Sequence, residues 1–153
     1  MNQLYKNIMV AVDGSKESSY AFQRGLEIAK RDGAKITVVH VVDTKSYVTF
    51  EPYSNLSISD AKNYGETLLQ EYRERAAQAD YDNIDIVLES GSPKKDLPQT
   101  IPAKHDVDLI ICGATGLNAV ERLLIGSVSE QIVRAAKCDV LIVRNEMQGE
   151  ITE

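Results

Sequence analysis

The chain of 153 residues has the size of one ordinary domain, and its 43% apolar and 26% charged residues are typical of a globular protein. Its formal net charge of −6 argues against a surface that binds nucleic acid or an anionic membrane, because such surfaces need clustered Lys and Arg. No run approaches the roughly 18 apolar residues of a membrane span, and the first six residues lack the apolar core of a secretion signal. We therefore expect a cytoplasmic protein without nucleic-acid or membrane partners.

Five short apolar runs rich in Val and Ile predict the strands of a parallel sheet. The first and fourth runs are nearly continuous rather than alternating, which is typical of strands that are covered on both faces. The predicted strands are residues 7–12, 35–42, 84–88, 107–112 and 139–143.

Helical patterns separate these runs, so that strand and helix alternate along the chain. We predict helices at residues 15–31, 60–79, 93–103 and 127–136, the third of them irregular because it contains Pro98 and Pro102. Gly33 is expected to end the first helix. The alternation predicts a single doubly wound α/β domain over residues 1–145, with helices on both faces, and a polar tail at 146–153. Residues 44–59 and 113–125 are predicted as long irregular segments.

The cysteines and histidines do not form a pattern that predicts a disulfide or a metal site. Cys112 and Cys138 are expected at opposite ends of neighbouring strands, and five strand residues span about 17 Å, which is beyond disulfide reach. We expect both cysteines to be reduced. His40 and His105 are far apart in the sequence, and we expect His40 near a strand end.

Turn residues and glycines follow the first and fourth predicted strands. In an open parallel sheet, ligands bind beyond the carboxyl ends of the strands, where the strand order reverses. Residues 12–15 follow the first strand, residues 113–116 follow the fourth, and the last helix begins near Gly126. If the first and fourth strands are neighbours, these segments border one crevice.

These residue types suit a polyphosphate ligand. Gly113 and Gly116 would let main-chain N–H groups approach phosphates closely, and Gly126 precedes a helix whose free N–H groups favour an anion. Asp13 suits a ribose hydroxyl, or a Mg²⁺ or Mn²⁺ ion bound with the nucleotide. Hydroxyls that can donate to phosphate oxygens belong to Thr115, Ser127 and Ser129.

Each feature also has a purely structural explanation. Ser127 and Glu130 match the S-x-x-E pattern of a capping box, and Asp13 with Gly14 is a common turn pair. The complete spacing, G-x-x-G, nine residues, then G-S, is more specific than any of its parts. The sequence lacks both G-x-x-x-x-G-K-[ST] and a G-x-G-x-x-G after the first strand, so it predicts neither a P-loop nor a dinucleotide site.

With these residues the chain resembles the universal stress protein family. The resemblance extends over nearly the whole length and rests on residues 7–15, 39–42, 108–113 and 138–143 together with the glycine spacing. The intact G-x-x-G-x9-G-S pattern is similar to that of family members that bind ATP. The resemblance implies a five-stranded parallel sheet with strand order 3-2-1-4-5, in which the first and fourth strands are adjacent.

The resemblance also implies roles for individual residues. Asp13 would lie near the ribose and phosphates, and the main chain of Val41 would read the edge of the adenine. Apart from the resemblance, the place of Arg122 inside the glycine loop suggests a phosphate contact, or else a position facing solvent or a second copy. The positions expected to surround the phosphates are Gly113, Gly116, Gly126 and Ser127, with Val12, Thr115, Val128 and Ser129 beside them.

Family members commonly form homodimers by pairing their last strands, which here lie between Asp139 and Arg144. We predict an ATP-binding stress-response or regulatory module with at most slow ATP hydrolysis, because only Asp13 suggests a base at the site. Two alternatives stay open: an ATP-using enzyme, such as a hydrolase or nucleotidyl transferase, and an interaction module that binds no nucleotide. Whether ATP, AMP or a cyclic nucleotide is the ligand also stays open.

Overall fold

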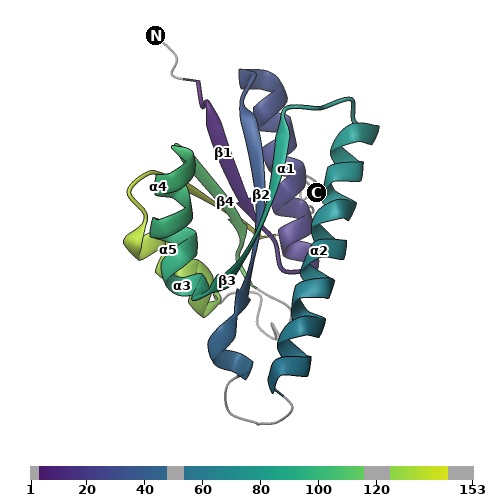
Figure 1. Ribbon diagram of the computed structural model, residues 1–153. Helices are drawn as coiled ribbons and strands as arrows, with labels where there is room; N and C mark the ends of the chain where they lie inside the picture. The colour runs from purple at the N-terminus through teal and green to yellow at the C-terminus, as the bar shows by residue number, and fades with distance from the viewer. Residues whose placement is uncertain (1–3, 48–53, 116–124, 145–153) are drawn as a thin grey trace, which may run out of the picture.

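In a computed structural model of the protein, five parallel strands form one sheet in the order β3-β2-β1-β4-β5, which confirms the predicted order. The structure describes residues 4–47, 54–115 and 125–144. Figure 1 shows α1 and α2 on one side of this sheet and α3, α4 and α5 on the other. The doubly wound α/β fold is therefore confirmed.

The elements follow one another as the alternation predicts, with some changes at their ends. In chain order they are β1 (Asn7–Ala11), α1 (Lys16–Asp32), β2 (Lys35–Asp43), the 3-10 turn η1 (Thr44–Tyr47), α2 (Ser54–Gln78), β3 (Ile84–Gly91), α3 (Pro93–Lys95), the π-helical turn η2 (Asp96–Thr100), α4 (Ile101–His105), β4 (Leu109–Gly113), α5 (Ser127–Ala135) and β5 (Asp139–Val143).

The structure corrects one predicted segment and adds detail to another. The prediction of irregular chain up to residue 59 is wrong, because α2 already begins at Ser54. Ser and Asn favour turns when isolated, but extending a helix that is already packed costs little. The predicted irregular helix at 93–103 is confirmed as three short pieces, in which Pro98 lies in the π-helical turn and Pro102 opens α4.

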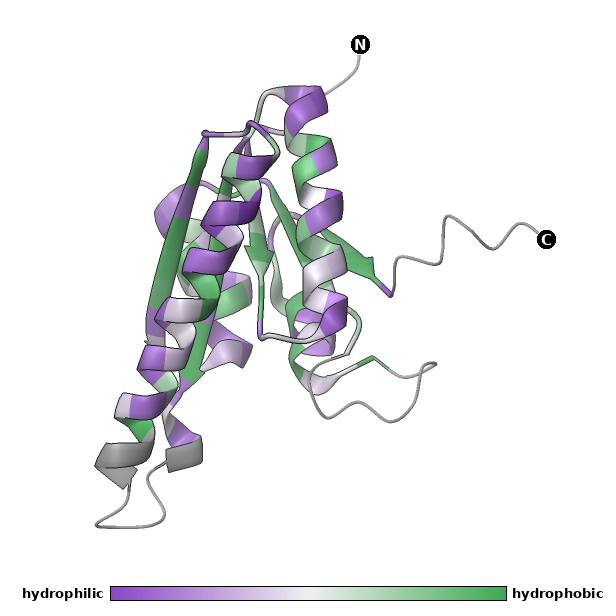
Figure 2. Ribbon diagram, turned by 90° about the vertical axis from the view of Figure 1, so that its right-hand side faces the viewer, coloured by the Kyte–Doolittle hydropathy of each residue, from purple (hydrophilic) through white to green (hydrophobic). Residues whose placement is uncertain are grey.

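Each face of the sheet is covered by its own hydrophobic cluster. On the α1 and α2 face, Phe22 and Tyr72 meet edge to face with ring centroids 4.9 Å apart. On the other face, Ile101 and Ile132 pack against Met9 and its neighbours in the sheet. Figure 2 shows hydrophobic strands between helices whose outer surfaces are largely hydrophilic. The double cover explains why the apolar runs of β1 and β4 are continuous.

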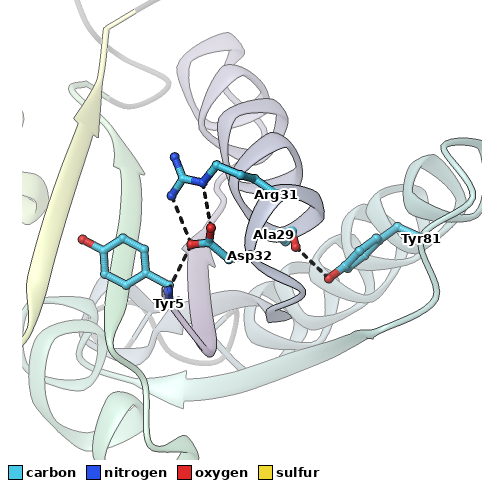
Figure 3. A network of polar contacts seen from close by, with 5 residues as sticks. All are labelled: Tyr5, Ala29, Arg31, Asp32 and Tyr81. Carbon is cyan, nitrogen blue, oxygen red and sulfur yellow. Dashed lines mark hydrogen bonds and ion pairs between the residues drawn. The ribbon is translucent and has the colours of Figure 1, made fainter. Parts of the chain in front are cut away.

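Polar contacts at the amino edge of the sheet attach the start of the chain to α1 and β5. The Tyr5 N–H donates to Asp32 over 3.0 Å, and Arg31 forms an ion pair with the same carboxylate at 2.7 Å (Figure 3). The Tyr5 hydroxyl donates to Asp139 over 2.6 Å. This hydrogen bond, together with burial, raises the pKa of Tyr5 to about 12. The network stabilises the edge opposite to the predicted crevice.

The carboxyl end of α1 confirms the role predicted for Gly33. Gly33 adopts a left-handed φ of 71°, and its N–H donates to the oxygen of Ala29 over 2.7 Å. The hydroxyl of Tyr81 donates to the same oxygen over 3.2 Å, as Figure 3 shows. Left-handed backbone favours glycine because it has no Cβ.

Both cysteines are free thiols, as expected, with Cys112 in β4 and Cys138 just before β5. Over the described ranges, no helix is both long and apolar enough to cross a membrane.

Candidate functional site at the carboxyl edge of the sheet

The first and fourth strands are neighbours, so the two predicted ligand segments leave the sheet at one edge. Ile8 pairs with Leu109 and Val10 with Ile111 in parallel register. Parallel strands in register end together, and this pair is the point where the strand order reverses. The structure therefore brings the turn after β1 and the end of β4 together, so the condition for a shared crevice is met, as the family resemblance implied.

The turn after β1 is stabilised by hydrogen bonds among its own residues. One carboxylate oxygen of Asp13 accepts from the Ser15 N–H over 2.9 Å, and Gly14 adopts a left-handed φ of 89°. The Ser15 hydroxyl caps α1 by accepting from the Ser18 N–H over 3.1 Å. The structural explanation of Asp13 and Gly14 as a turn is thus correct. The second carboxylate oxygen of Asp13 accepts no hydrogen bond from any other described residue, so it can receive a hydroxyl or a metal ion.

Glycine at position 113 is explained by packing. A Cβ there would lie 2.6 Å from the Cβ of Glu17 and 2.9 Å from its main-chain carbon, so only glycine lets α1 approach β4 this closely. The Gly113 oxygen accepts a 2.6 Å hydrogen bond from the buried hydroxyl of Ser129. The hydrogen of that hydroxyl is committed to this bond, so Ser129 does not act as the side-chain donor to phosphate that we expected. Its main-chain N–H lies in the first turn of α5.

The start of α5 differs from the predicted capping box. Gly126 is the capping residue, with φ −63° and ψ 158°, and its N–H donates to the Ala114 oxygen over 2.7 Å. Ser127 is therefore the first helical residue, one position too late to form a box with Glu130, and that prediction is wrong. Its exposed hydroxyl is not used as a cap.

The first turns of the two helices at this edge contrast with each other. At the start of α1, the Ser15 hydroxyl accepts from the Ser18 N–H, and the Asp13 carboxylate accepts from the N–H of the capping residue Ser15. At the start of α5, no side-chain cap is present, and within the described residues the amides of Ser127, Val128 and Ser129 have no acceptor. Uncapped first-turn amides and the helix dipole attract an anion. Of these two termini, that of α5 is therefore the one without a side-chain cap.

Val12 does not offer its main chain to a ligand. Its N–H donates to the Val39 oxygen over 2.9 Å, and its own oxygen lies 2.8 Å from Nδ1 of His40. Its side chain is buried. Val12 can therefore contribute only its side chain, as part of the wall of the site. Val41 lies two residues after Val39, which accepts the last hydrogen bond between β1 and β2.

The structure adds Tyr64, which the sequence analysis missed. Tyr64 lies on α2, its hydroxyl contacts Gly14 where a side chain would otherwise stand, and it is 49% exposed. Its ring meets that of His40 edge to face at 6.1 Å between centroids. Burial raises the pKa of Tyr64, and the charge of Asp13 raises it further. No local pattern marks Tyr64, because its neighbours come from β1 and β2.

Three further residues of the predicted site belong to the glycine loop, and the structure describes only the first of them. Thr115 is partly buried and ends the described part of the glycine loop, while Gly116 and Arg122 lie outside the described residues. Cys112 lies beneath the site, where burial raises the pKa of its thiol to about 11 and Asp13 adds to the effect. Among the described residues, no group of three or more His, Cys, Asp and Glu side chains is placed to hold a metal ion.

Comparisons with known proteins identify the family and the fold. The sequence model of the universal stress protein family matches residues 4–144. A protein of Staphylococcus haemolyticus (strain JCSC1435) that is named as a universal stress protein is 47% identical over 142 residues, which cover 93% of this chain and 86% of that protein. Among solved structures, the universal stress protein UspA from Lactobacillus plantarum has a TM-score of 0.85 at 29% identity, over 94% of this chain and 100% of that one. A universal stress protein in complex with cAMP has a TM-score of 0.64 at 28% identity, over 92% and 98% of the two chains.

Proposed function

The chain belongs to the universal stress protein family, and from this premise we propose that it binds an adenine nucleotide, with ATP as the expected ligand, at the carboxyl edge of β1 and β4. The observation that carries the proposal is the uncapped first turn of α5 beside the closed turn of Asp13. A relative of this fold that is 28% identical was solved with cAMP, which supports a nucleotide as the class of ligand.

Each part of the nucleotide has a matching group at this edge. The amides of Ser127, Val128 and Ser129, with the Ser127 hydroxyl, would hold the phosphates. The second carboxylate oxygen of Asp13 would accept from a ribose hydroxyl, and the main chain of Val41 would contact the base. Gly116 and Arg122, which lie outside the described residues, remain predicted phosphate contacts.

A metal ion would enter this site with the nucleotide. Asp13 supplies one carboxylate ligand, and phosphate oxygens and water would complete the octahedral set that Mg²⁺ prefers. We expect any hydrolysis to be slow, far below the roughly 1 to 1,000 turnovers per second of typical enzymes. A turnover in that range would favour the alternative of an ATP-using enzyme.

A charge placed at the start of α5 tests the site. Ser127→Glu puts a carboxylate where the phosphates would bind, yet acidic residues in a first turn favour helix formation, so the variant should fold. Lys137→Gln is the matched control, because it changes the net charge by the same amount beyond the other end of α5, at an exposed residue. Titration calorimetry with ATP should show an affinity at least about tenfold lower for Ser127→Glu only, since removing charge-assisted hydrogen bonds costs more than 1.4 kcal/mol. Equal affinities in the two variants, or no binding of ATP, AMP or cAMP by the wild type, would reject the proposal.

We also propose that the protein forms a homodimer through β5. β5 is the last strand in the sheet order, so within the described part of the chain only β4 pairs with it. Its outer edge would otherwise present unpaired main-chain groups. The Ala114 N–H donates to the Val143 oxygen, so the N–H of the preceding residue, Ile142, faces outward.

Light scattering tests the proposed dimer. The wild type should have twice the 16.9 kDa mass of one chain. Ile142→Pro removes the outward donor and should give monomers, whereas Ile142→Thr keeps the N–H and should leave the dimer intact. A monomeric wild type would refute this assembly without touching the nucleotide site. The cytoplasmic location remains a prediction that cell fractionation would test.

A further inference from the structure

We propose that His40 is a positioning residue for the nucleotide base, an inference that rests on the proposed function. Its ring nitrogen Nδ1 binds the main-chain oxygen of Val12. That oxygen is then not used for the next hydrogen bond of the ladder between β1 and β2, which the Val41 N–H would donate. The N–H and C=O of Val41 then stay available, side by side, for the edge of a purine.

The hydrogen bonds of β2 show which way Val41 faces. The Lys35 N–H donates to the Lys6 oxygen, on the β1 side, and the next N–H, of Ile36, donates to Asn83, on the β3 side. Main-chain groups of a strand alternate in this way along its length. Odd-numbered residues of β2 thus direct both main-chain groups toward β1, and Val41 is one of them.

The next bond of the ladder toward β1 is missing. The last one joins the Val12 N–H to the Val39 oxygen over 2.9 Å, and the pattern of a parallel pair would continue with the Val41 N–H donating to the Val12 oxygen. That oxygen instead lies 2.8 Å from Nδ1 of His40. Among the described residues, nothing else accepts from the Val41 N–H.

The assignment of the proton follows from the partner. A carbonyl oxygen only accepts, so Nδ1 of His40 carries the hydrogen and donates it. The neutral ring with its hydrogen on Nδ1 and the protonated ring both make this bond, so the ring holds the Val12 oxygen in either charge state.

Packing keeps the ring of His40 in place. A Cβ on Gly65 of α2 would lie 2.8 Å from Cδ2 of His40 and 2.7 Å from Cδ1 of Leu88, so only glycine lets the helix backbone lie directly on the ring. Tyr64 meets the same ring edge to face. The imidazole therefore packs between α2 and the strand, and these contacts favour the orientation that faces Val12.

The exposed pair of groups suits adenine. An edge of adenine presents an amino donor beside a ring-nitrogen acceptor, as its N6 and N7 do. The Val41 C=O can accept from the amino group while the Val41 N–H donates to the ring nitrogen. Without His40, the Val12 oxygen would take the Val41 N–H, and the base would lose its donor.

Amide hydrogen exchange followed by NMR tests the inference in the wild type. The Val39 N–H, on the same strand and facing the same way, is the matched reference, because it lies within the paired part of β1 and β2. In the nucleotide-free protein the Val41 amide should exchange at least about tenfold faster than that of Val39, and ATP should slow it. A Val41 amide as protected as that of Val39 before nucleotide is added would overturn the inference, whatever the variants do.

Affinities for three ligands, measured in two variants, distinguish a role of His40 in binding the base from a role in binding the phosphates. His40→Leu should bind ATP roughly tenfold more weakly, the effect of one lost hydrogen bond, while its affinity for inorganic tripolyphosphate, which has no base, should stay within about twofold. The 5′-triphosphate of purine riboside lacks only the amino group and keeps the ring nitrogen that accepts from the Val41 N–H, so His40→Leu should weaken its binding by about the same factor as that of ATP. His40→Asn keeps a donor near the position of Nδ1 and should restore ATP affinity and rapid exchange at Val41.

The affinities for ATP and tripolyphosphate distinguish a failure of this inference from a failure of the proposed function. If the wild type binds neither ATP nor tripolyphosphate, the site itself is wrong and the inference falls with it. If ATP binds and His40→Leu lowers the affinities for ATP and tripolyphosphate equally, the site stands but His40 has no role toward the base. Loss of ATP affinity in His40→Leu with slower exchange at Val41 supports the inference.

Discussion

The buried hydroxyl of Ser129, in the first turn of α5, donates to the main-chain oxygen of Gly113, the last residue of β4, over 2.6 Å. The bond joins the two ends of the glycine loop and sets where the open amides of α5 lie relative to the sheet. The Gly126 N–H, which donates to Ala114, adds a second link between the same two segments.

Removing this link should loosen the site and the fold together. Ser129→Ala leaves the Gly113 oxygen buried without its donor, and we expect the free energy of unfolding to fall by about 1–3 kcal/mol. Urea denaturation measures it. Ser127→Ala removes an exposed hydroxyl from the same turn and should change stability by less than about 0.5 kcal/mol. Equal stabilities for the two variants would mean that the bond to Gly113 contributes nothing.

A side chain at Gly113 should be costly because α1 lies against it. In Gly113→Ala the new Cβ would overlap Glu17, and overpacking of this kind costs about 1–3 kcal/mol. Gly33→Ala is a useful comparison, since a Cβ there has no neighbour within 4 Å and only the left-handed backbone is unfavourable. Gly33→Asn, which tolerates that backbone, should recover part of the loss, whereas no polar substitution should rescue Gly113. A Gly113→Ala variant with wild-type stability would show that α1 moves away freely.

The contact between Tyr5 and Asp139 should depend on alkaline pH. The phenol ionises near pH 10 in the unfolded chain but near 12 in the folded one, because the neutral hydroxyl donates to Asp139. Its contribution to stability is therefore complete below pH 10 and is lost as the pH rises from 10 to 12. The difference in unfolding free energy between wild type and Tyr5→Phe should shrink over that range. A difference that stays constant up to pH 11.5 would exclude this ionisation as the cause.

Cys112 should react slowly with thiol reagents in the folded protein. Burial raises its pKa to about 11, so at pH 8 only about one thiol in a thousand is the reactive thiolate. Cys138 is less buried, and its pKa is raised as well. In a Cys138→Ser variant, labelling of Cys112 should become fast only when urea unfolds the chain. Rapid labelling without denaturant would show that the region beneath the site opens readily.

Much of the fold could be predicted because it depends on local pattern. The continuous run at Ile8 to Val10 and the left-handed turn at Gly33 are short-range signals, and both were correct. The strand order came from the family resemblance rather than from periodicity. The cap of α5 was misplaced by one residue, because Ser127 matches the S-x-x-E pattern of a capping box. In the structure Gly126 is the capping residue, and its N–H donates to the Ala114 oxygen.

The less predictable part of the site consists of contacts between distant segments. Tyr64 touches Gly14 across fifty residues of sequence, and the ring of His40 reaches Val12 on the neighbouring strand. The sequence singled out Gly113 as a phosphate-binding position, whereas the structure explains its glycine by the approach of Glu17. Such contacts depend on how helices dock on the sheet, which no periodicity in a single sequence specifies.

Assigned NMR spectra recorded during titration with ATP and Mg²⁺ locate the nucleotide on the sheet. We predict that the amides of Ser127, Val128 and Val41 shift with added ATP, while those of Tyr5 and Asp139 at the opposite edge stay unchanged. Shifts confined to the amino edge, or no shifts at millimolar ATP, would contradict a nucleotide site at the carboxyl edge of β1 and β4.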